Sequence, residues 1–218
     1  MKFIPLAAAV LTALALTACS GSDEVPAADE TLSEAASAMA EVENVHFALE
    51  VDGEVEGLEI TTADGVVTSG GDAEGTGVLT AMGMDVEVSY VIVGEDAYVK
   101  GFTGGYQQIP VGDEMLPYDP TLLLTPDSGV AALLESYDSA EPQESEEVDG
   151  VEAYRYLVTF DPAAFSRLIP AEGEWNTATV WFDREHSRVV KARFEQGGST
   201  VTLTFSDYDE PVDIDAPQ

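Results

Sequence analysis

Residues 84–100 read MDVEVSYVIVGEDAYVK, and this stretch decides the fold class. Met84, Val86 and Val88 alternate with polar residues, which is typical of a β-strand with one buried face. An apolar run follows to residue 93, and Gly-Glu-Asp at 94–96 turns the chain into a second short strand at 97–100. The stretch therefore predicts an antiparallel hairpin.

The same period-two alternation recurs on both sides of this hairpin. We expect strands at residues 45–51, 58–60, 66–68 and 77–80, with a glycine-rich turn at 70–75, and later at 154–160, 177–182, 189–194 and 200–205. About ten antiparallel strands joined mostly by tight turns predict one large meandering sheet. A sheet of that size must curl or close, and its concave side must be filled.

Helical segments interrupt the strands. The capping residues before Pro120 and Pro126 predict two leucine-rich helices, and Asp161 before Pro162 predicts a short helix that is closed by Pro170. An acidic loop is expected at residues 138–147. The predicted fold class is α+β, a large curved antiparallel sheet whose concave side is filled in part by helices.

Cys19 is the only cysteine in the chain and closes the run Leu16-Thr17-Ala18-Cys19. Lys2 and a weakly apolar stretch precede it, which is the layout of a secretory signal, and this stretch is shorter than a membrane span. A leucine two positions before a small residue, followed at once by cysteine, resembles the bacterial lipobox. The resemblance implies cleavage before Cys19 and diacylation of its thiol. The alternative is an ordinary secreted protein with an incidental cysteine.

These signals divide the chain into three parts. Residues 1–18 are predicted to be a lipoprotein signal peptide and residues 19–30 an acylated N-terminus with a flexible tether. Residues 31–218 are predicted to form one domain, which begins with a helix because Thr31 and Glu34 stand in capping-box spacing. With Cys19 acylated no other thiol remains, so packing alone must stabilise this domain.

The charge balance is extreme, with 42 acidic against 8 basic residues and a formal net charge of −34. Binding to DNA or RNA is excluded as a function class, because it depends on Lys and Arg neutralising phosphates. Adhesion to an anionic membrane surface is disfavoured for the same reason. The acids are scattered over turns and outward strand positions, which indicates a solvated surface. A saline habitat is one setting that such a surface suits.

Catalytic and metal-binding motifs are missing from the sequence. Two histidines, His46 and His186, and one cysteine cannot assemble a Cys/His zinc site, and no EF-hand loop, nucleophile elbow, P-loop or dinucleotide glycine pattern occurs. We therefore expect no catalytic residue, metal or cofactor. The basic residues of the C-terminal third either pair with neighbouring acids or line a pocket mouth that meets an anionic headgroup; they are Arg167, Arg184, Arg188, Lys191 and Arg193.

Several segments, in this order and spacing, resemble the LppX/LprAFG family of actinobacterial lipoproteins. They are Val45-His46-Phe47, Ala97-Tyr98-Val99-Lys100, Tyr118-Asp119-Pro120, Val148-Asp149-Gly150-Val151, Val180-Trp181-Phe182-Asp183 with Arg188-Val189-Val190, and Phe205-Ser206-Asp207-Tyr208-Asp209-Glu210-Pro211-Val212. The resemblance covers almost the whole chain from about residue 31. It implies a half-barrel sheet with helices on its concave side and an apolar cavity that holds the acyl chains of a phospholipid or glycolipid.

The resemblance also implies the setting. Such a protein is anchored through a diacylglyceryl cysteine at the extracytoplasmic face of the cytoplasmic membrane and carries lipid toward the outer envelope, without covalent chemistry and conceivably with an envelope transport partner. The expected cavity lining is Met84, Val86, Val88, Leu122, Leu123, Val130, Leu133, Leu134, Phe165, Leu168 and Ile169. The same residues could form a closed core, as in a structural or interaction lipoprotein without a cavity. A carboxylate-based envelope hydrolase is the third alternative.

Overall fold

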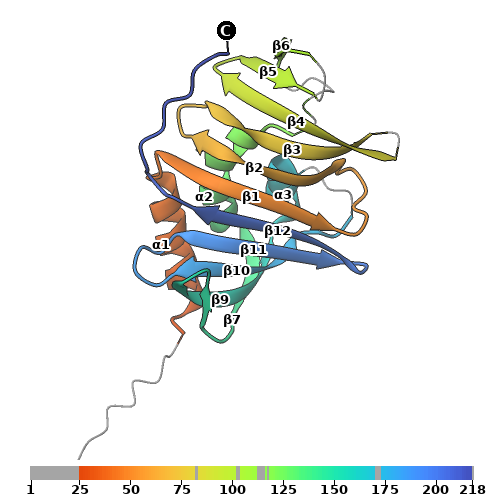
Figure 1. Cartoon of the computed structure of the whole chain (residues 1–218). Coiled ribbons are helices and arrows are strands. Elements are labelled where there is room, and N and C mark those ends of the chain that lie inside the picture. The colour runs from red at the N-terminus through yellow and green to blue at the C-terminus, as the bar shows by residue number, and fades with distance from the viewer. Residues whose placement is uncertain are drawn as a thin grey trace, which may run out of the picture.

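A single antiparallel sheet carries most of the chain (Figure 1). This computed structural model describes residues 25–81, 83–101, 104–111, 116, 118–169 and 173–217. The first half of the sheet comprises β1 (Asn44–Asp52), β2 (Ile60–Thr68), β3 (Ala73–Ala81), β4 (Met84–Val93), β5 (Asp96–Lys100) and β6 (Gln107–Pro110). The second half comprises β7 (Tyr137–Pro142), β8 (Glu146–Val148), β9 (Val151–Phe160), β10 (Thr177–Asp183), β11 (Val189–Gln196) and β12 (Ser199–Ser206).

The two halves meet in the middle of the sheet, where β1 pairs with β12. The strand order is β6-β5-β4-β3-β2-β1-β12-β11-β10-β9-β7, and β8 pairs with β9 beside this path. Phe47 of β1 lies opposite Phe205 of β12, so the buried faces of the two halves are continuous. The predicted 84–100 hairpin is confirmed as β4 and β5, which pair from Val93 opposite Asp96.

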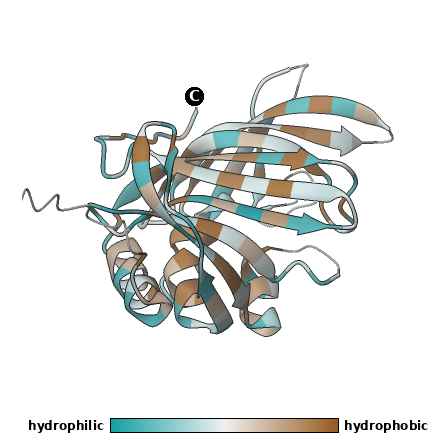
Figure 2. Ribbon diagram, turned by 90° about the horizontal axis from the view of Figure 1, so that it is seen from below, coloured by the Kyte–Doolittle hydropathy of each residue, from teal (hydrophilic) through white to brown (hydrophobic). Residues whose placement is uncertain are grey.

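Four short helices lie on one face of the sheet, and Figure 2 shows them gathered below it. They are α1 (Ala28–Ala40), the 3-10 helix η1 (Pro120–Leu124), α2 (Val130–Glu135) and α3 (Pro162–Leu168). Two of the predicted helix starts are confirmed by their caps. The carboxylate of Asp119 accepts a hydrogen bond from Thr121 N at 3.0 Å, and that of Asp161 accepts one from Ala164 N at 2.8 Å. The α+β fold class is confirmed.

The N-terminal helix starts earlier than the capping-box pattern predicts. It begins at Ala28, so residues 28–30 belong to α1 instead of the tether, and Ala27 at its start makes no side-chain cap. Thr31 is buried inside the helix, where its hydroxyl is 2.8 Å from Tyr156 Oη, and Tyr156 donates to Pro26 O at 3.0 Å. The capping-box prediction is wrong because a tertiary partner takes the Thr31 hydroxyl.

The middle of the chain also differs from the sequence prediction. No helix starts at Pro126; residues 126–128 form a turn in which Gly129 N donates to Thr125 O at 2.7 Å, and α2 starts only at Val130. The predicted acidic loop at 138–147 contains strands β7 and β8, both paired with β9. Its exposed acids hide these strands, because edge positions carry little apolar alternation.

The strands before the first hairpin are longer than predicted. Strand β2 contains the whole expected segment at 66–68 but only Ile60 of the one at 58–60, because residues 58 and 59 precede the strand. The predicted glycine-rich turn is confined to residues 69–72. Gly75 lies within β3 opposite Gly65 of β2. These glycines interrupt the apolar pattern of two continuous strands, which is why the sequence suggested turns.

Candidate ligand-binding interior

Three apolar pockets lie between the sheet and the helices. The central pocket is lined by Phe47, Leu49, Leu58, Ile60, Ala63, Tyr118, Leu123, Ile169, Phe194, Val201 and Leu203. The β4-side pocket is lined by Phe47, Ile60, Ala63, Gly77, Leu79, Val88, Tyr90, Leu116, Tyr118 and Pro120. The α2-side pocket is lined by Val130, Leu133, Leu134, Phe160, Leu168, Ile169, Val180, Val189, Ala192, Phe194, Leu203 and Phe205. None of these lining residues is charged.

The three pockets are neighbours that share walls. Phe47, Ile60, Ala63 and Tyr118 line both the central and the β4-side pockets. Three other residues line both the central and the α2-side pockets; they are Ile169, Phe194 and Leu203. The pockets therefore follow one another across the sheet, from β4 over β1 and β12 to β10. Movement of the shared side chains would join them into one apolar channel.

The pockets are narrow in this structure. The volume open to a water molecule is about 20 Å³ in the central pocket and about 30 Å³ in each of the other two. By this measure a cavity needs roughly 10–15 Å³ to hold one water. An acyl chain therefore needs the lining side chains to change rotamer before it can enter. Inserting extra groups into a close-packed core typically costs about 1–3 kcal/mol, because side chains are forced away from their preferred rotamers.

The structure places seven of the eleven expected lining residues in the three pockets. Leu123 lines the central pocket, Val88 the β4-side pocket, and Ile169 both the central and the α2-side pockets. Four more of the expected residues line the α2-side pocket; they are Val130, Leu133, Leu134 and Leu168. Their role in holding a ligand stays a prediction.

The other four expected residues lie outside the three pockets. Phe165 is buried against Phe194, with ring centroids 5.3 Å apart, and Leu122 is half-buried on η1. Val86 and Met84 lie on the same face of β4 as Val88 but nearer the strand's start, and Met84 is 63% exposed. The alternation placed them on the correct face of the strand. It could not show how far along β4 the pocket extends.

Sequence reasoning missed most of the sheet's contribution to the pockets. Phe47 and Leu203 fall within strands expected at 45–51 and 200–205, but neither they nor Tyr90 and Tyr118 were singled out as lining residues. Period two assigns a residue to a face, but only strand order shows that β1 and β12 meet over the middle of the interior. Burial raises the pKa of the Tyr118 hydroxyl, with Asp119 adding to the effect, so this phenol stays neutral.

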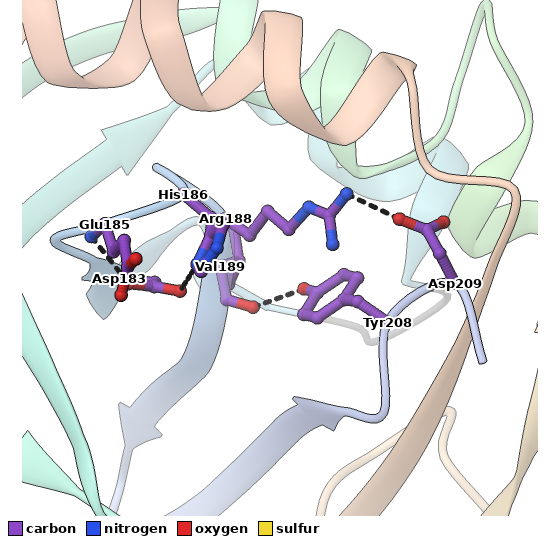
Figure 3. Close-up of polar contacts among 7 residues, drawn as sticks. All are labelled: Asp183, Glu185, His186, Arg188, Val189, Tyr208 and Asp209. Carbon is purple, nitrogen blue, oxygen red and sulfur yellow. Dashed lines mark hydrogen bonds and ion pairs between the residues drawn. The ribbon is translucent and has the colours of Figure 1, made fainter.

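The C-terminal basic residues pair with acids and aromatic rings instead of lining the pockets. Arg188 Nη2 lies 2.5 Å from Asp209 Oδ2 and its guanidinium lies over the Tyr208 ring, 4.9 Å from the centroid (Figure 3). Lys191 lies 5.3 Å from the centroid of the Trp181 ring. The remaining contacts of this set are Arg184 with Glu152, Arg193 with Glu195, and Arg167 with the carbonyl of Ala163. Pairing accounts for these cations, and none of them lines a described apolar pocket.

On the outer face of the sheet, His46 contacts both a serine and an aspartate, the residue types of a catalytic triad. His46 Nδ1 is 3.2 Å from Ser206 Oγ, and His46 Nε2 is 3.3 Å from Asp64 Oδ1. Ser206, however, donates its hydroxyl hydrogen to Asp207 Oδ2 at 3.1 Å, so the proton is not directed at the imidazole that a nucleophile requires as its base. Asp64 is also 64% exposed, which weakens its influence on His46. This geometry gives no support to a hydrolase.

Neither a metal site nor a membrane-spanning helix is found among the described residues. Among them, no group of three His, Cys, Asp or Glu side chains could hold a metal ion. No helix in the described part of the chain is long and apolar enough to cross a membrane. The predicted signal peptide and Cys19 lie outside the described residues.

An open antiparallel sheet with helices over one face defines the fold class seen in two solved mycobacterial lipoproteins. LprF from Mycobacterium bovis matches with a TM-score of 0.75 at 21% identity, over 89% of this chain and 99% of that one. LppX from Mycobacterium tuberculosis matches with a TM-score of 0.64 at 25% identity, over 88% of this chain and 100% of that one.

The sequence comparison then identifies the family. The family model described as LppX_LprAFG lipoprotein matches residues 27–214. A relative from Mycolicibacterium smegmatis, named lipoarabinomannan carrier protein LprG, is 30% identical over 97% of this chain and 94% of its own length. This chain belongs to the LppX/LprAFG lipoprotein family, as its sequence segments predicted.

Proposed function

We propose that this protein is a lipid carrier of the cell envelope, anchored through Cys19, that encloses the acyl chains of a phospholipid or glycolipid between its sheet and helices. The observation that carries the proposal is the row of three apolar pockets with shared walls. The relative named as a lipoarabinomannan carrier supports a glycolipid as the ligand. Burial of hydrocarbon in such a channel supplies affinity at roughly 25 cal/mol per Å².

The narrowness of the pockets is compatible with one alternative as well. Cavity volumes of about 20–30 Å³ fit a structural or interaction lipoprotein with a closed core as well as a carrier in its closed state. The two candidates differ in whether the interior opens to admit lipid, which can be measured directly.

The experiment uses the full chain carrying Cys19→Ser, so that the anchor's own acyl groups are not counted. The purified protein is extracted and its lipids are quantified by mass spectrometry. A carrier should retain lipid at a substantial fraction of one molecule per protein, and Ala63→Trp should lower that content at least tenfold. Ala63 lines both the central and the β4-side pockets, so an indole there occupies their junction.

The matched control is Ala48→Trp, on the neighbouring strand and the outer face, which should keep the wild-type lipid content. Circular dichroism and melting temperature establish that each variant is folded. If Ala63→Trp does not fold, Leu133→Trp tests the α2-side pocket in its place. A lipid-free parent protein, or a folded Ala63→Trp variant with full lipid content, would contradict the carrier proposal.

A further inference from the structure

The hydroxyl of Tyr90 is a polar group without a partner in the apolar interior. Tyr90 is 5% exposed, and its buried Oη atom makes no hydrogen bond with any described residue. A buried, unpaired hydroxyl costs folding free energy, and phenylalanine would fill the same space without that cost. Such a group therefore needs an explanation outside the protein's own hydrogen bonds.

The chain makes room for this hydroxyl with two glycines. Tyr90 lies opposite Gly75 of β3, which in turn lies opposite Gly65 of β2. A Cβ atom built on either glycine would lie 2.6 Å from Tyr90 Oη. The phenol therefore extends from β4 across β3, and its oxygen lies against the backbone of the paired glycines. The Tyr90 residue itself is part of the lining of the β4-side pocket.

The chemistry of the surroundings restricts what this hydroxyl can bind. Among the described lining residues of the three pockets, Tyr90 and Tyr118 carry the polar side-chain groups. Burial, with a contribution from the Asp64 carboxylate, raises the pKa of Tyr90, so the phenol keeps its hydrogen. It is therefore a hydrogen-bond donor among hydrocarbon, which suits a neutral acceptor that can enter an apolar pocket.

We propose that Tyr90 donates a hydrogen bond to the ester carbonyl oxygen of a bound acyl lipid and so positions the carbonyl end of one chain in the β4-side pocket. An ester carbonyl is an uncharged acceptor that is covalently attached to the chain that the apolar walls would hold. A cationic site is not required, in keeping with the pairing of the C-terminal arginines. This inference rests on the proposed function and adds the chemical class of ligand that the site prefers, an acyl ester.

The test compares two lipids that differ only in the carbonyl groups. Delipidated full-length chain carrying Cys19→Ser is titrated with dipalmitoyl phosphatidylglycerol and with its dihexadecyl ether analogue, in competition with a fluorescent acyl probe. The protein with Tyr90 intact should bind the diester about threefold to tenfold more tightly, which corresponds to one hydrogen bond in an apolar site. Tyr90→Phe should lose this preference while it binds the ether as the parent does.

Tyr98→Phe is the matched control. Tyr98 lies on β5 between Ala97 and Val99, which are buried on the inner face, so its own side chain lies on the outer face and the lipid preference should not change. A preference that persists in Tyr90→Phe, or equal affinity of the parent for ester and ether, would overturn the inference while the carrier function stands. If the parent binds neither lipid, both proposals fail.

A second measurement reports on the hydroxyl in the absence of lipid. Tyr90→Phe removes an unpaired buried group, so the delipidated variant should melt at a temperature about 2–4 °C above the parent. A clearly lower melting temperature would mean that the hydroxyl already has a partner within the protein, and this would also overturn the inference.

Discussion

At the scale of single residues, Asp209 ties the end of the chain to the centre of the sheet. Its carboxylate accepts a hydrogen bond from Glu43 N at 2.8 Å and pairs with Arg188, while its own N–H donates to Asn44 O at 2.9 Å. Desolvation by partial burial acts to raise the pKa of Asp209, but the hydrogen bonds from Glu43 N–H and Arg188 outweigh it and hold the pKa below the ordinary 3.8.

Asp209→Asn should therefore lower the free energy of unfolding at pH 7 by about 1–2 kcal/mol, because half-buried Arg188 loses its charged partner. A depressed carboxylate pKa stabilises the fold above the unfolded value of 3.8, and this stabilisation is lost as the pH falls through the lower folded value. The difference between wild type and variant should thus be constant from pH 7 to about pH 5. It should shrink below pH 4, as measured by urea unfolding at each pH.

Glu195→Gln provides the comparison, since it removes the exposed partner of Arg193 and should cost less than about 0.5 kcal/mol. An equal loss in both variants would show that overall charge, and not the partly buried network at Asp209, controls the stability.

At the scale of strands, the contact between Tyr90 and the glycines of β2 and β3 makes one prediction. Gly75→Ala should lower the free energy of unfolding by about 2–3 kcal/mol, because the new Cβ would lie 2.6 Å from Tyr90 Oη and closer still to the backbone oxygen of Asp64. Gly77→Ala, two residues along β3 on the same face, should change it by less than about 1 kcal/mol, since its nearest neighbour is 3.2 Å away.

Guanidinium unfolding of the two glycine variants gives the comparison directly. Equal destabilisation would mean that general strand propensity decides the effect. The combination of Gly75→Ala with Tyr90→Phe should recover only part of the loss, because the contact with the Asp64 carbonyl remains.

The elements differ in how far sequence could predict them, and the reasons are physical. The 84–100 hairpin was predictable, because strict alternation and a Gly-Glu-Asp turn agree. Strands β7 and β8 were missed, since edge strands with exposed acids owe their structure to pairing with β9 and carry no apolar pattern of their own. The start of α1 was misplaced, because Thr31 hydrogen-bonds to a residue 125 positions away.

At the scale of the whole molecule, the interior depends on strand order, which the sequence did not reveal. Two meanders run outward from the adjoining β1 and β12, so residues from both ends of the chain line the central pocket. Inward faces could be assigned from alternation, and the leucines of α2 from their spacing. Phe47 and Leu203 line the same pocket only because β1 pairs with β12 and brings the two halves of the sheet together.

The strong acidity of the whole chain bears on the proposed anchoring through Cys19. With 42 acidic and 8 basic residues, electrostatic attraction to an anionic membrane surface is disfavoured, so the proposed attachment depends on acyl groups. Cys19→Ser should therefore move the chain from the membrane to the soluble fraction at both low and high salt, while its lipid content in the pockets persists. Ser20→Ala, one residue along, should leave the protein on the membrane. A Cys19→Ser chain that still sediments with membranes would show that another part of the molecule makes the attachment, whereas a soluble chain that retains lipid would show that anchoring and lipid binding are separable properties.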